Sequence, residues 1–394
     1  MAENNEQPLD LRTRAVMAGR AEGENSLAPV LYPSSVFTYD SVEEGQKLAT
    51  SLAPERFYTR YGNPTINAFE EAVADLEGAE AARAFSSGMG AMSTVVLGLC
   101  SSGDHIVAQR QIYAGTQLLL QSVCPRMGID VTFVDGTAEG AFADAVIPGK
   151  TMLVIAETPA NPRLDLVDLE ALGALSGPMT VVDSTFATPL GQNPLAFGVD
   201  LVLHSATKGI AGHNDATIGV VAGSQELLAW LWSFAVLHGG NASPFDALNA
   251  LRGLRTLGVR LDQQAATALH LAQFLESNPG ACEVRYPGLD SHPQRALAQR
   301  QMNSNGSLLT FDLVGGSAAG QKFVEATKIA WQATSLGGPE TLVTHPASTT
   351  HVSLTPEELA LSGIGPGTVR VSCGLEQVND LQADFAQALA ATEV

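Results

Sequence analysis

The stretch Asp200-Leu-Val-Leu-His204-Ser205-Ala206-Thr207-Lys208 runs from an apolar strand into two hydroxyls and a lysine. The chain has only five lysines, and the other four lie among polar residues or beside turn residues, as expected of solvated surface. A lysine amine becomes a nucleophile when its surroundings lower its pKa, and it then binds a carbonyl carbon as a Schiff base. A lysine that only caps a strand is the commoner case. The interpretation of Lys208 therefore depends on which partners the rest of the chain supplies.

Length and composition indicate a globular enzyme of two domains. The chain has 394 residues, more than one hydrophobic core usually holds. It is 45% apolar and 16% charged, as in well-packed globular proteins. Its 21 basic and 41 acidic residues give a net charge of −20, which argues against nucleic acid or an anionic membrane as a partner. No apolar run approaches the ~20 residues that span a bilayer.

The N-terminal residues and the cysteines indicate the cellular compartment of the protein. Residues 1–8 are polar and acidic and lack the basic and apolar regions of a signal peptide, so we expect a cytoplasmic protein. The spacing of the four cysteines matches neither a disulfide framework nor a metal site. We therefore expect thiols in a reducing compartment and no metal.

The first 55 residues lack regular alternation and contain several prolines, which indicates an extended arm with at most short helices. An arm of this length usually packs on something, and a partner subunit is a natural candidate. The arm leads into Phe57-Tyr58-Thr59-Arg60-Tyr61-Gly62-Asn63-Pro64, where Gly-Asn-Pro predicts a turn followed by a helix from about Thr65 to Glu77. The aromatic residues and the arginine before this turn either pack locally or deliver the arginine to an anion.

From about residue 80 the pattern alternates between short apolar strands and helices. This alternation predicts an α/β domain with a mostly parallel sheet covered on both faces. The expected strands are 104–108, 131–135, 151–156, 180–182, 200–203 and 217–222.

Sites in such sheets form outside the carboxyl ends of the strands. The residues that follow the predicted strands are an aromatic, an amide, a carboxylate, two hydroxyls and a lysine, namely Tyr113, Asn161, Asp183, Ser205, Thr207 and Lys208. A buried aspartate needs a cationic partner, and a protonated ring nitrogen would serve. Upstream, Ser87-Gly88-Met89-Gly90 opens an apolar helix, and a glycine-rich turn at a helix N-terminus is a common phosphate-binding site.

The C-terminal part predicts a smaller α+β layer. A long helical stretch, 244–276, is expected to bridge the two domains. Strands then follow at 283–286, 307–313, 329–333 and 368–373, with helices at 317–327, 356–362 and 378–392. Arg370 lies within the last of these strands. An arginine there usually faces solvent, but one that faces a cleft would bind a carboxylate with both nitrogens.

Together these groups are what pyridoxal phosphate (PLP) requires: a Schiff-base lysine, a carboxylate for the ring nitrogen, a stacking aromatic and a phosphate site. From about residue 29 to 389 the chain also resembles the fold type I PLP enzymes of cysteine and methionine metabolism, and most of all their methionine γ-lyase and cystathionine γ-lyase branches. The resemblance rests on long motifs in the same order, namely Tyr58-Thr-Arg60-Tyr-Gly-Asn-Pro-Thr, Ser87-Gly-Met-Gly, Asp183-Ser-Thr-Phe-Ala-Thr-Pro, His204-Ser-Ala-Thr-Lys208, Ser335-Leu-Gly-Gly, His345-Pro-Ala-Ser and Arg370-Val-Ser-Cys-Gly-Leu-Glu.

The resemblance implies an architecture and an assembly. It implies an extended inter-subunit arm (1–60), a large PLP-binding domain with a seven-stranded-type sheet (61–255) and a C-terminal domain (256–394). It also implies a homotetramer built from two active dimers.

The same resemblance implies a role for each site residue. Lys208 would hold the cofactor and move the Cα proton, Asp183 would keep the ring nitrogen protonated, and Tyr113 would stack on the ring and transfer a proton to the leaving group. The implied phosphate ligands are Gly88, Met89, Ser205 and Thr207, joined by Tyr58 and Arg60 of the neighbouring subunit. The implied ligands of the substrate carboxylate are Asn161, Ser335 and Arg370.

Three further positions bear on the substrate. Gly115 stands where methionine γ-lyases usually have a cysteine, and in this respect resembles the cystathionine enzymes. Thr334 and Phe57 stand where cystathionine γ-lyases and γ-synthases usually have acidic residues that bind the distal amino group. A thioether or thiol end therefore suits Phe57 and Thr334 better.

We accordingly expect a PLP-dependent C–S lyase that eliminates the γ-substituent of a small sulfur amino acid. Methionine, which would yield methanethiol, ammonia and 2-oxobutanoate, or homocysteine is the expected substrate. The alternatives are a cystathionine γ-lyase or γ-synthase, and then an O-acylhomoserine sulfhydrylase. A scaffold without a cofactor is a further alternative, but it would have no need of Lys208, Asp183, Tyr113 and Arg370 together. The residue after the lysine, Gly209, replaces a bulkier one, with no evident consequence.

Overall fold

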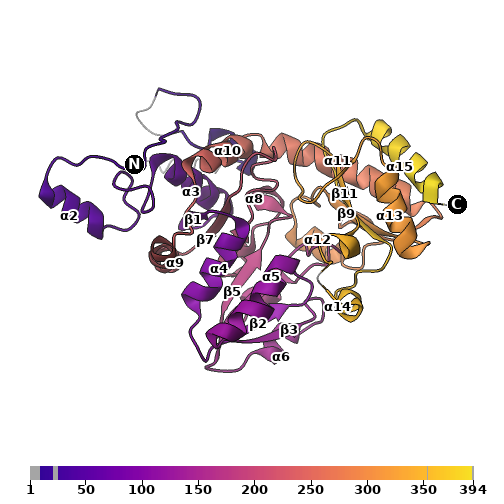
Figure 1. Cartoon of the computed structure of the whole chain (residues 1–394), viewed down its shortest axis with the longest axis horizontal. Helices are drawn as coiled ribbons and strands as arrows, with labels where there is room; N and C mark the ends of the chain where they lie inside the picture. Colours follow the sequence, from indigo (N-terminus) through magenta and orange to yellow (C-terminus); the bar gives the residue numbers. More distant parts are fainter. Residues whose placement is uncertain (1–8, 21–24, 353, 393–394) are drawn as a thin grey trace, which may run out of the picture.

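A seven-stranded sheet forms the centre of the larger layer of the molecule (Figure 1). The computed structural model describes residues 9–20, 25–352 and 354–392. The expectation about a signal peptide, which concerned residues 1–8, lies outside them. In spatial order the strands are β1 (Ala81–Phe85), β7 (Gly219–Gly223), β6 (Leu201–His204), β5 (Met179–Asp183), β4 (Thr151–Glu157), β2 (His105–Gln109) and β3 (Asp130–Val134).

The sheet is mostly parallel, as predicted. Only β7 runs antiparallel to its neighbours, β1 and β6, and the other adjacent strands are parallel. The register places Glu157 beside Asp183 and Asp183 beside Leu203. The carboxyl ends of β4, β5 and β6 therefore lie at one edge. Of these seven strands, only the edge strand β1 was missing from the predicted set, because its run of alanines carries little strand signal.

Helices cover both faces of this sheet. Leu201 and Leu203 pack on one face with α4 (Gly88–Leu99) and α9 (Gln225–His238), whereas Val202 packs on the other with α3 (Pro64–Glu77) and α10 (Pro244–Leu254). The alternation follows from the two-residue period of a strand. Shorter helical segments complete the layer: α5 (Ala114–Leu118), η1 (Leu119–Val123), η2 (Cys124–Met127), α6 (Ala141–Ala145), α7 (Leu169–Gly173), α8 (Thr188–Gly191) and η3 (Pro194–Phe197).

Local sequence explains where α3 begins and ends. The Asn63 side chain accepts a hydrogen bond from the Thr65 N–H, and Pro64 occupies the first helical position, where its missing N–H costs nothing. Gly78 ends the helix in the left-handed conformation, at φ 68°. The helix predicted from Thr65 to Glu77 is therefore confirmed to within one residue.

The predicted helical stretch 244–276 is wrong in one respect, since it consists of two helices, α10 and α11 (Leu257–Glu276). The Gly253 carbonyl accepts from Arg260 Nη2 (2.7 Å) and from the Thr256 N–H (3.0 Å). These bonds occupy an acceptor that a continuous helix would use, and α10 ends at Leu254.

The smaller layer is a five-stranded sheet in the order β10 (Trp331–Gln332), β11 (Leu342–Thr344), β12 (Thr368–Ser372), β9 (Leu308–Leu313) and β8 (Ala281–Arg285). Its core packs against α11, α13 (Gly316–Ala326) and α15 (Val378–Thr392). The remaining helical segments of this part of the chain are α12 (Arg295–Gln301), η4 (Pro346–Ser348) and α14 (Pro356–Leu361). The α+β prediction is confirmed, although β11 was not predicted and β10 is shorter than expected.

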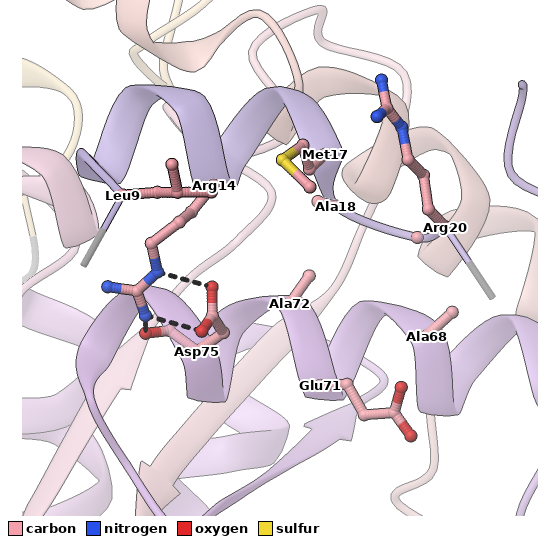
Figure 2. A pocket seen from close by; sticks show the side chains of 10 residues that line it. Leu9, Arg14, Met17, Ala18, Arg20, Ala68, Glu71, Ala72 and Asp75 are labelled. Atoms are coloured by element: carbon pink, nitrogen blue, oxygen red, sulfur yellow. Dashed lines mark hydrogen bonds and ion pairs between the residues drawn. The ribbon is translucent and has the colours of Figure 1, made fainter. Parts of the chain in front are cut away.

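The N-terminal segment attaches to the large layer and then extends from it. In α1 (Leu11–Met17), Arg14 donates to the Asp75 carboxylate of α3 (Nη2 to Oδ1, 2.6 Å) and also to its carbonyl, beside a cavity of about 250 Å³ (Figure 2). Farther along, α2 (Val42–Thr50) projects away from both sheets and exposes Val42 (Figure 1). No helix within residues 9–20, 25–352 and 354–392 combines the length and apolar character needed to cross a membrane.

Candidate active site

A cavity of about 460 Å³ opens at the carboxyl ends of β4, β5 and β6, where the two layers meet. This is the position expected for the site of a parallel sheet. Its lining residues are Ser87, Gly88, Met89, Met92, Tyr113, Thr116, Glu157, Asn161, Asp183, Thr185, Phe186, Ser205, Thr207, Lys208, Thr217, Thr334, Ser335, Leu336, Thr350 and Arg370.

Lys208 reaches the cavity from the turn that follows β6. Its Nζ donates to Ser335 Oγ at 2.7 Å, which joins the large layer to the small one. Burial, together with the smaller effect of the positive charge of Arg370, lowers the pKa of Lys208 to about 8. A substantial fraction of this amine is therefore neutral near physiological pH, as a nucleophile requires.

Asp183 is a buried carboxylate with one free oxygen. Its Oδ1 accepts from Thr185 N (3.0 Å) and Thr185 Oγ1 (2.5 Å), while Oδ2 has no hydrogen-bond partner among the described residues. Burial raises the pKa of Asp183, against the effect of the Thr185 bonds. A cation placed at Oδ2 would reverse that shift, so a protonated ring nitrogen fits here.

The N-terminus of α4 forms a cradle for an anion. Ser87 caps this helix by accepting from the Gly90 N–H at 2.9 Å. At Gly88 a Cβ atom would lie only 2.6 Å from the Cβ of Ser205, so the close approach of the two segments requires glycine. The Thr207 hydroxyl bonds the backbone of Ile218 in both directions, which holds the neighbouring turn in place. The cradle fits a phosphate group.

Tyr113 forms the open side of the cavity and is 42% exposed. Its backbone N–H donates to Glu157 Oε2 at 2.9 Å. Its ring lies so close to Gly115 that a Cβ there would be 2.4 Å from Tyr113 Cε1. Gly115 is not among the described residues that line the cavity, but its lack of a side chain leaves room for this ring.

Arg370 closes the opposite side, and its side chain faces the cleft rather than solvent. It is 4% exposed, with Nη1 donating to Asn161 Oδ1 (3.0 Å) and Nη2 to the Ser335 carbonyl (2.9 Å). Burial lowers the pKa of Arg370 to about 10, against the attraction of Glu157. Ser335 adopts φ 85°, a strained conformation for a residue with a side chain.

The cavity brings together most of the predicted site residues, but four of them lie elsewhere. Tyr58, Arg60, Phe57 and Gly115 are not among its described lining residues. The expectation that Phe57 and Thr334 together suit a thioether or thiol end stays a prediction, since Phe57 belongs to the segment expected to reach a neighbouring subunit. Within its own chain Phe57 packs in the arm against the rings of Tyr39 and Tyr61, next to a short antiparallel bridge between Val36 and Tyr58.

Sequence reasoning missed Glu157 as a member of the site. It lies at the carboxyl end of β4, as Asp183 does at the end of β5, and is 4% exposed. Burial raises the pKa of Glu157 well above its ordinary value, and the neighbouring Asp183 adds to this. The rule that drew attention to Asp183 could have identified Glu157 too. Phe186 and Thr350 had no comparable signal.

Comparison with known proteins agrees with this geometry. The profile of the family described as Cys/Met metabolism PLP-dependent enzyme matches residues 12–390. The L-methionine γ-lyase of Pseudomonas deceptionensis is 42% identical, with 96% of this chain and 97% of the relative covered. The O-succinylhomoserine sulfhydrylase of Pseudomonas aeruginosa is 41% identical, with 96% and 95% covered. The cystathionine γ-synthase of Xanthomonas oryzae pv. oryzae, solved in complex with cystathionine, matches with a TM-score of 0.91 at 38% identity, covering 98% and 99%.

Fold, site and comparisons together define a PLP-dependent enzyme of fold type I. More narrowly, the chain belongs to the family of Cys/Met metabolism PLP-dependent enzymes. The expected fold class, cofactor and family are thereby confirmed.

Proposed function

We propose that this protein is a C–S lyase that removes the γ-substituent of a small sulfur amino acid, with L-methionine or L-homocysteine as substrate. For methionine the products are methanethiol, ammonia and 2-oxobutanoate. The supporting observation is the charge pattern of the cavity. Among the described residues that line it, the charged ones are Glu157, Asp183, Lys208 and Arg370. Each of these four already has a partner or a proposed role.

The remaining wall therefore suits an uncharged substituent. Thr334, Leu336, Phe186, Met89 and Met92 contribute hydroxyl, aliphatic, aromatic and thioether surface. The distal amino and carboxylate groups of cystathionine would be desolvated there without a partner, which is costly. A methylthio group carries no such cost and packs well against thioether and aromatic side chains.

The proposal gives each of the chain's own groups a role that its position supports. Arg370 and Asn161 bind the substrate carboxylate, with Ser335 beside them, and this orients the Cα–H bond toward Lys208. The neutral amine of Lys208 takes up the Cα proton. Tyr113 donates a proton to the departing sulfur. Asp183 holds the ring nitrogen, while Gly88, Met89, Ser205 and Thr207 hold the phosphate. The bound cofactor supplies an electron-accepting ring that stabilises negative charge on the substrate carbons.

Each site needs a neighbouring subunit in this proposal. Arg60 Nη1 donates to the Val236 carbonyl at 2.7 Å, and its guanidinium stacks on Tyr58 and Tyr61. Tyr58 is 40% exposed at the surface of its own chain. An arginine and a tyrosine placed in this way are available to a partner's phosphate site, with Phe57 beside them. The assembly is then a homotetramer of two active dimers.

Mixed assemblies test the shared site. Arg60→Ala and Lys208→Ala each inactivate every site of a pure assembly, but a mixed dimer regains one intact site when the arginine acts in trans. Activity should therefore return on mixing after dissociation and reassociation. No recovery would place Arg60 in its own subunit's site.

The reaction is tested by measuring 2-oxobutanoate release from methionine, homocysteine and cystathionine with purified protein. We expect release from methionine or homocysteine to exceed that from cystathionine. Preference for cystathionine would favour a cystathionine γ-lyase. Formation of cystathionine from an O-acylhomoserine and cysteine would favour a γ-synthase. The Pseudomonas aeruginosa relative supports one further alternative, in which an O-acylhomoserine reacts with sulfide.

The proposal also includes a domain organisation and a cellular location. We retain the arm (1–60), the PLP-binding domain (61–255) and the C-terminal domain (256–394) as the domain organisation. We also place the protein in the cytoplasm, since all four of its cysteines are free thiols, as is usual in a reducing compartment.

A further inference from the structure

Glu157 occupies a junction between the two sides of the cavity. Its Oε2 accepts from the Tyr113 N–H at 2.9 Å and its Oε1 from the Asn161 N–H at 2.6 Å. Its own N–H donates to Gln109 Oε1 at 2.8 Å, which fixes the end of β4. Each carboxylate oxygen thus holds the backbone of a different loop, one after β2 and one after β4.

Hydrogen bonds continue from Glu157 round the cavity. On one side the Asn161 side chain accepts from Arg370, Arg370 donates to the Ser335 carbonyl, and the Ser335 hydroxyl accepts from Lys208. On the other side the path ends at Tyr113. Among the described residues, Glu157 is the hydrogen-bonding link between Tyr113 and this series.

We propose that Glu157 is a positioning residue that sets the ring of Tyr113 and the amide of Asn161 relative to one another through its two carboxylate oxygens. It thereby couples the stacking of the cofactor ring to the binding of the substrate carboxylate. The inference rests on the proposed roles of Tyr113 and Asn161.

The geometry makes glutamine an informative substitution at this position. Glu157→Gln preserves shape but replaces one acceptor oxygen with a donor NH₂ group, so only one of the two backbone N–H groups keeps its partner. Glu157→Asp keeps both acceptors but withdraws them from the Tyr113 and Asn161 N–H groups. A matched control is Asp384→Asn. Asp384 is also a buried carboxylate that accepts from backbone N–H groups (Lys328, Ile329 and Ala330), but it lies in the C-terminal layer away from the cavity.

The test measures three properties of the holoenzyme: KM for the amino acid substrate, the dissociation constant of PLP, and the visible circular dichroism of the bound cofactor, which reports the orientation of its ring. Loss of one hydrogen bond to a buried group costs about a factor of ten, so Glu157→Gln should raise KM or the PLP dissociation constant about tenfold. It should also change the visible dichroism. Glu157→Asp should lie between Glu157→Gln and wild type.

Asp384→Asn should lower the melting temperature and leave all three properties unchanged. If Glu157→Gln behaves like Asp384→Asn, with only its melting temperature lowered, Glu157 is merely structural and the inference is overturned. Wild-type protein is measured in the same series. If it forms no visible band with PLP, the proposed function fails as well, so the two failures are distinguishable.

Discussion

The two walls of the cavity are built in different ways. The wall from the large sheet takes Asp183, Ser205 and Lys208 from the ends of adjacent strands, whose register fixes their separation. The wall from the small layer takes Thr334, Ser335 and Arg370 from a loop and a strand of a different sheet. Contacts between the layers, such as Lys208 to Ser335, join the two. The geometry of the first wall is fixed within one sheet, whereas the position of the second depends on how the two layers pack on each other.

The largest expected effect on activity comes from a substitution in the wall of the large sheet. Lys208→Ala removes the group proposed to hold the cofactor and move the proton, so turnover should fall by about 10³-fold or more. Borohydride treatment followed by peptide mapping should label Lys208 in wild type and no lysine in the variant. Lys322→Ala, an exposed lysine of α13, is the control and should behave as wild type. Equal labelling of another lysine would contradict the assignment.

Arg370→Leu tests the wall of the small layer. In the proposed site the substitution leaves the substrate carboxylate without its bidentate partner, so KM should rise about 100-fold while the visible band of the cofactor persists. Arg260→Lys is a matched comparison. Arg260 is equally buried, but its guanidinium donates to the backbone carbonyls of Gly209, Ile210 and Gly253. That variant should lose thermal stability with little change in KM. A normal KM in Arg370→Leu would remove Arg370 from substrate binding.

Gly115→Ala acts on Tyr113, which lies between the two walls. The added methyl group would be 2.4 Å from Tyr113 Cε1, so the ring must move. Because catalysis is sensitive to displacements of this size, kcat should fall about tenfold. Gly98→Ala in α4 is the control, since its Cβ would lie 3.4 Å from Phe234, an ordinary contact. Steady-state kinetics of both variants would show whether the ring position matters.

Thr334→Glu adds a negative charge to the wall from the small layer. A carboxylate there would offer a partner to the distal amino group of cystathionine, so kcat/KM for cystathionine should rise about fivefold and that for methionine should fall. Thr334→Gln, of similar size but uncharged, should not show this preference. If both variants respond alike, charge at position 334 does not decide the substrate.

The pH dependence of cofactor uptake gives the smallest expected effect. Only the neutral amine of Lys208 attacks the cofactor aldehyde, and its pKa is lowered to about 8. The rate at which the visible band forms in cofactor-free protein should therefore increase with pH through about 8 and level off above it. An unperturbed lysine would show its midpoint near 10.5. Because Arg370 contributes to the lowering, its removal should move the midpoint upward.

Much of this site was predictable because its residues follow strands. Asp183, Ser205, Thr207 and Lys208 each come directly after an apolar run, and parallel strands bring such positions to one edge. Glu157 was missed although it obeys the same rule. The break between α10 and α11 was missed for a different reason, since it depends on a side chain of the following helix, Arg260.

The sequence by itself determined the α/β architecture, the cofactor and most of the cavity's residues, because hydrophobic period and strand ends are local properties. Only the tertiary structure decided that Arg370 faces the cleft rather than solvent. It also decided that Phe57 lies outside the cavity of its own chain. It also brought Tyr113, Glu157 and Asn161 into one hydrogen-bonded group. These arrangements depend on how the two sheets pack on each other and on which backbone groups a buried carboxylate meets. Neither is encoded in the order of neighbouring residues.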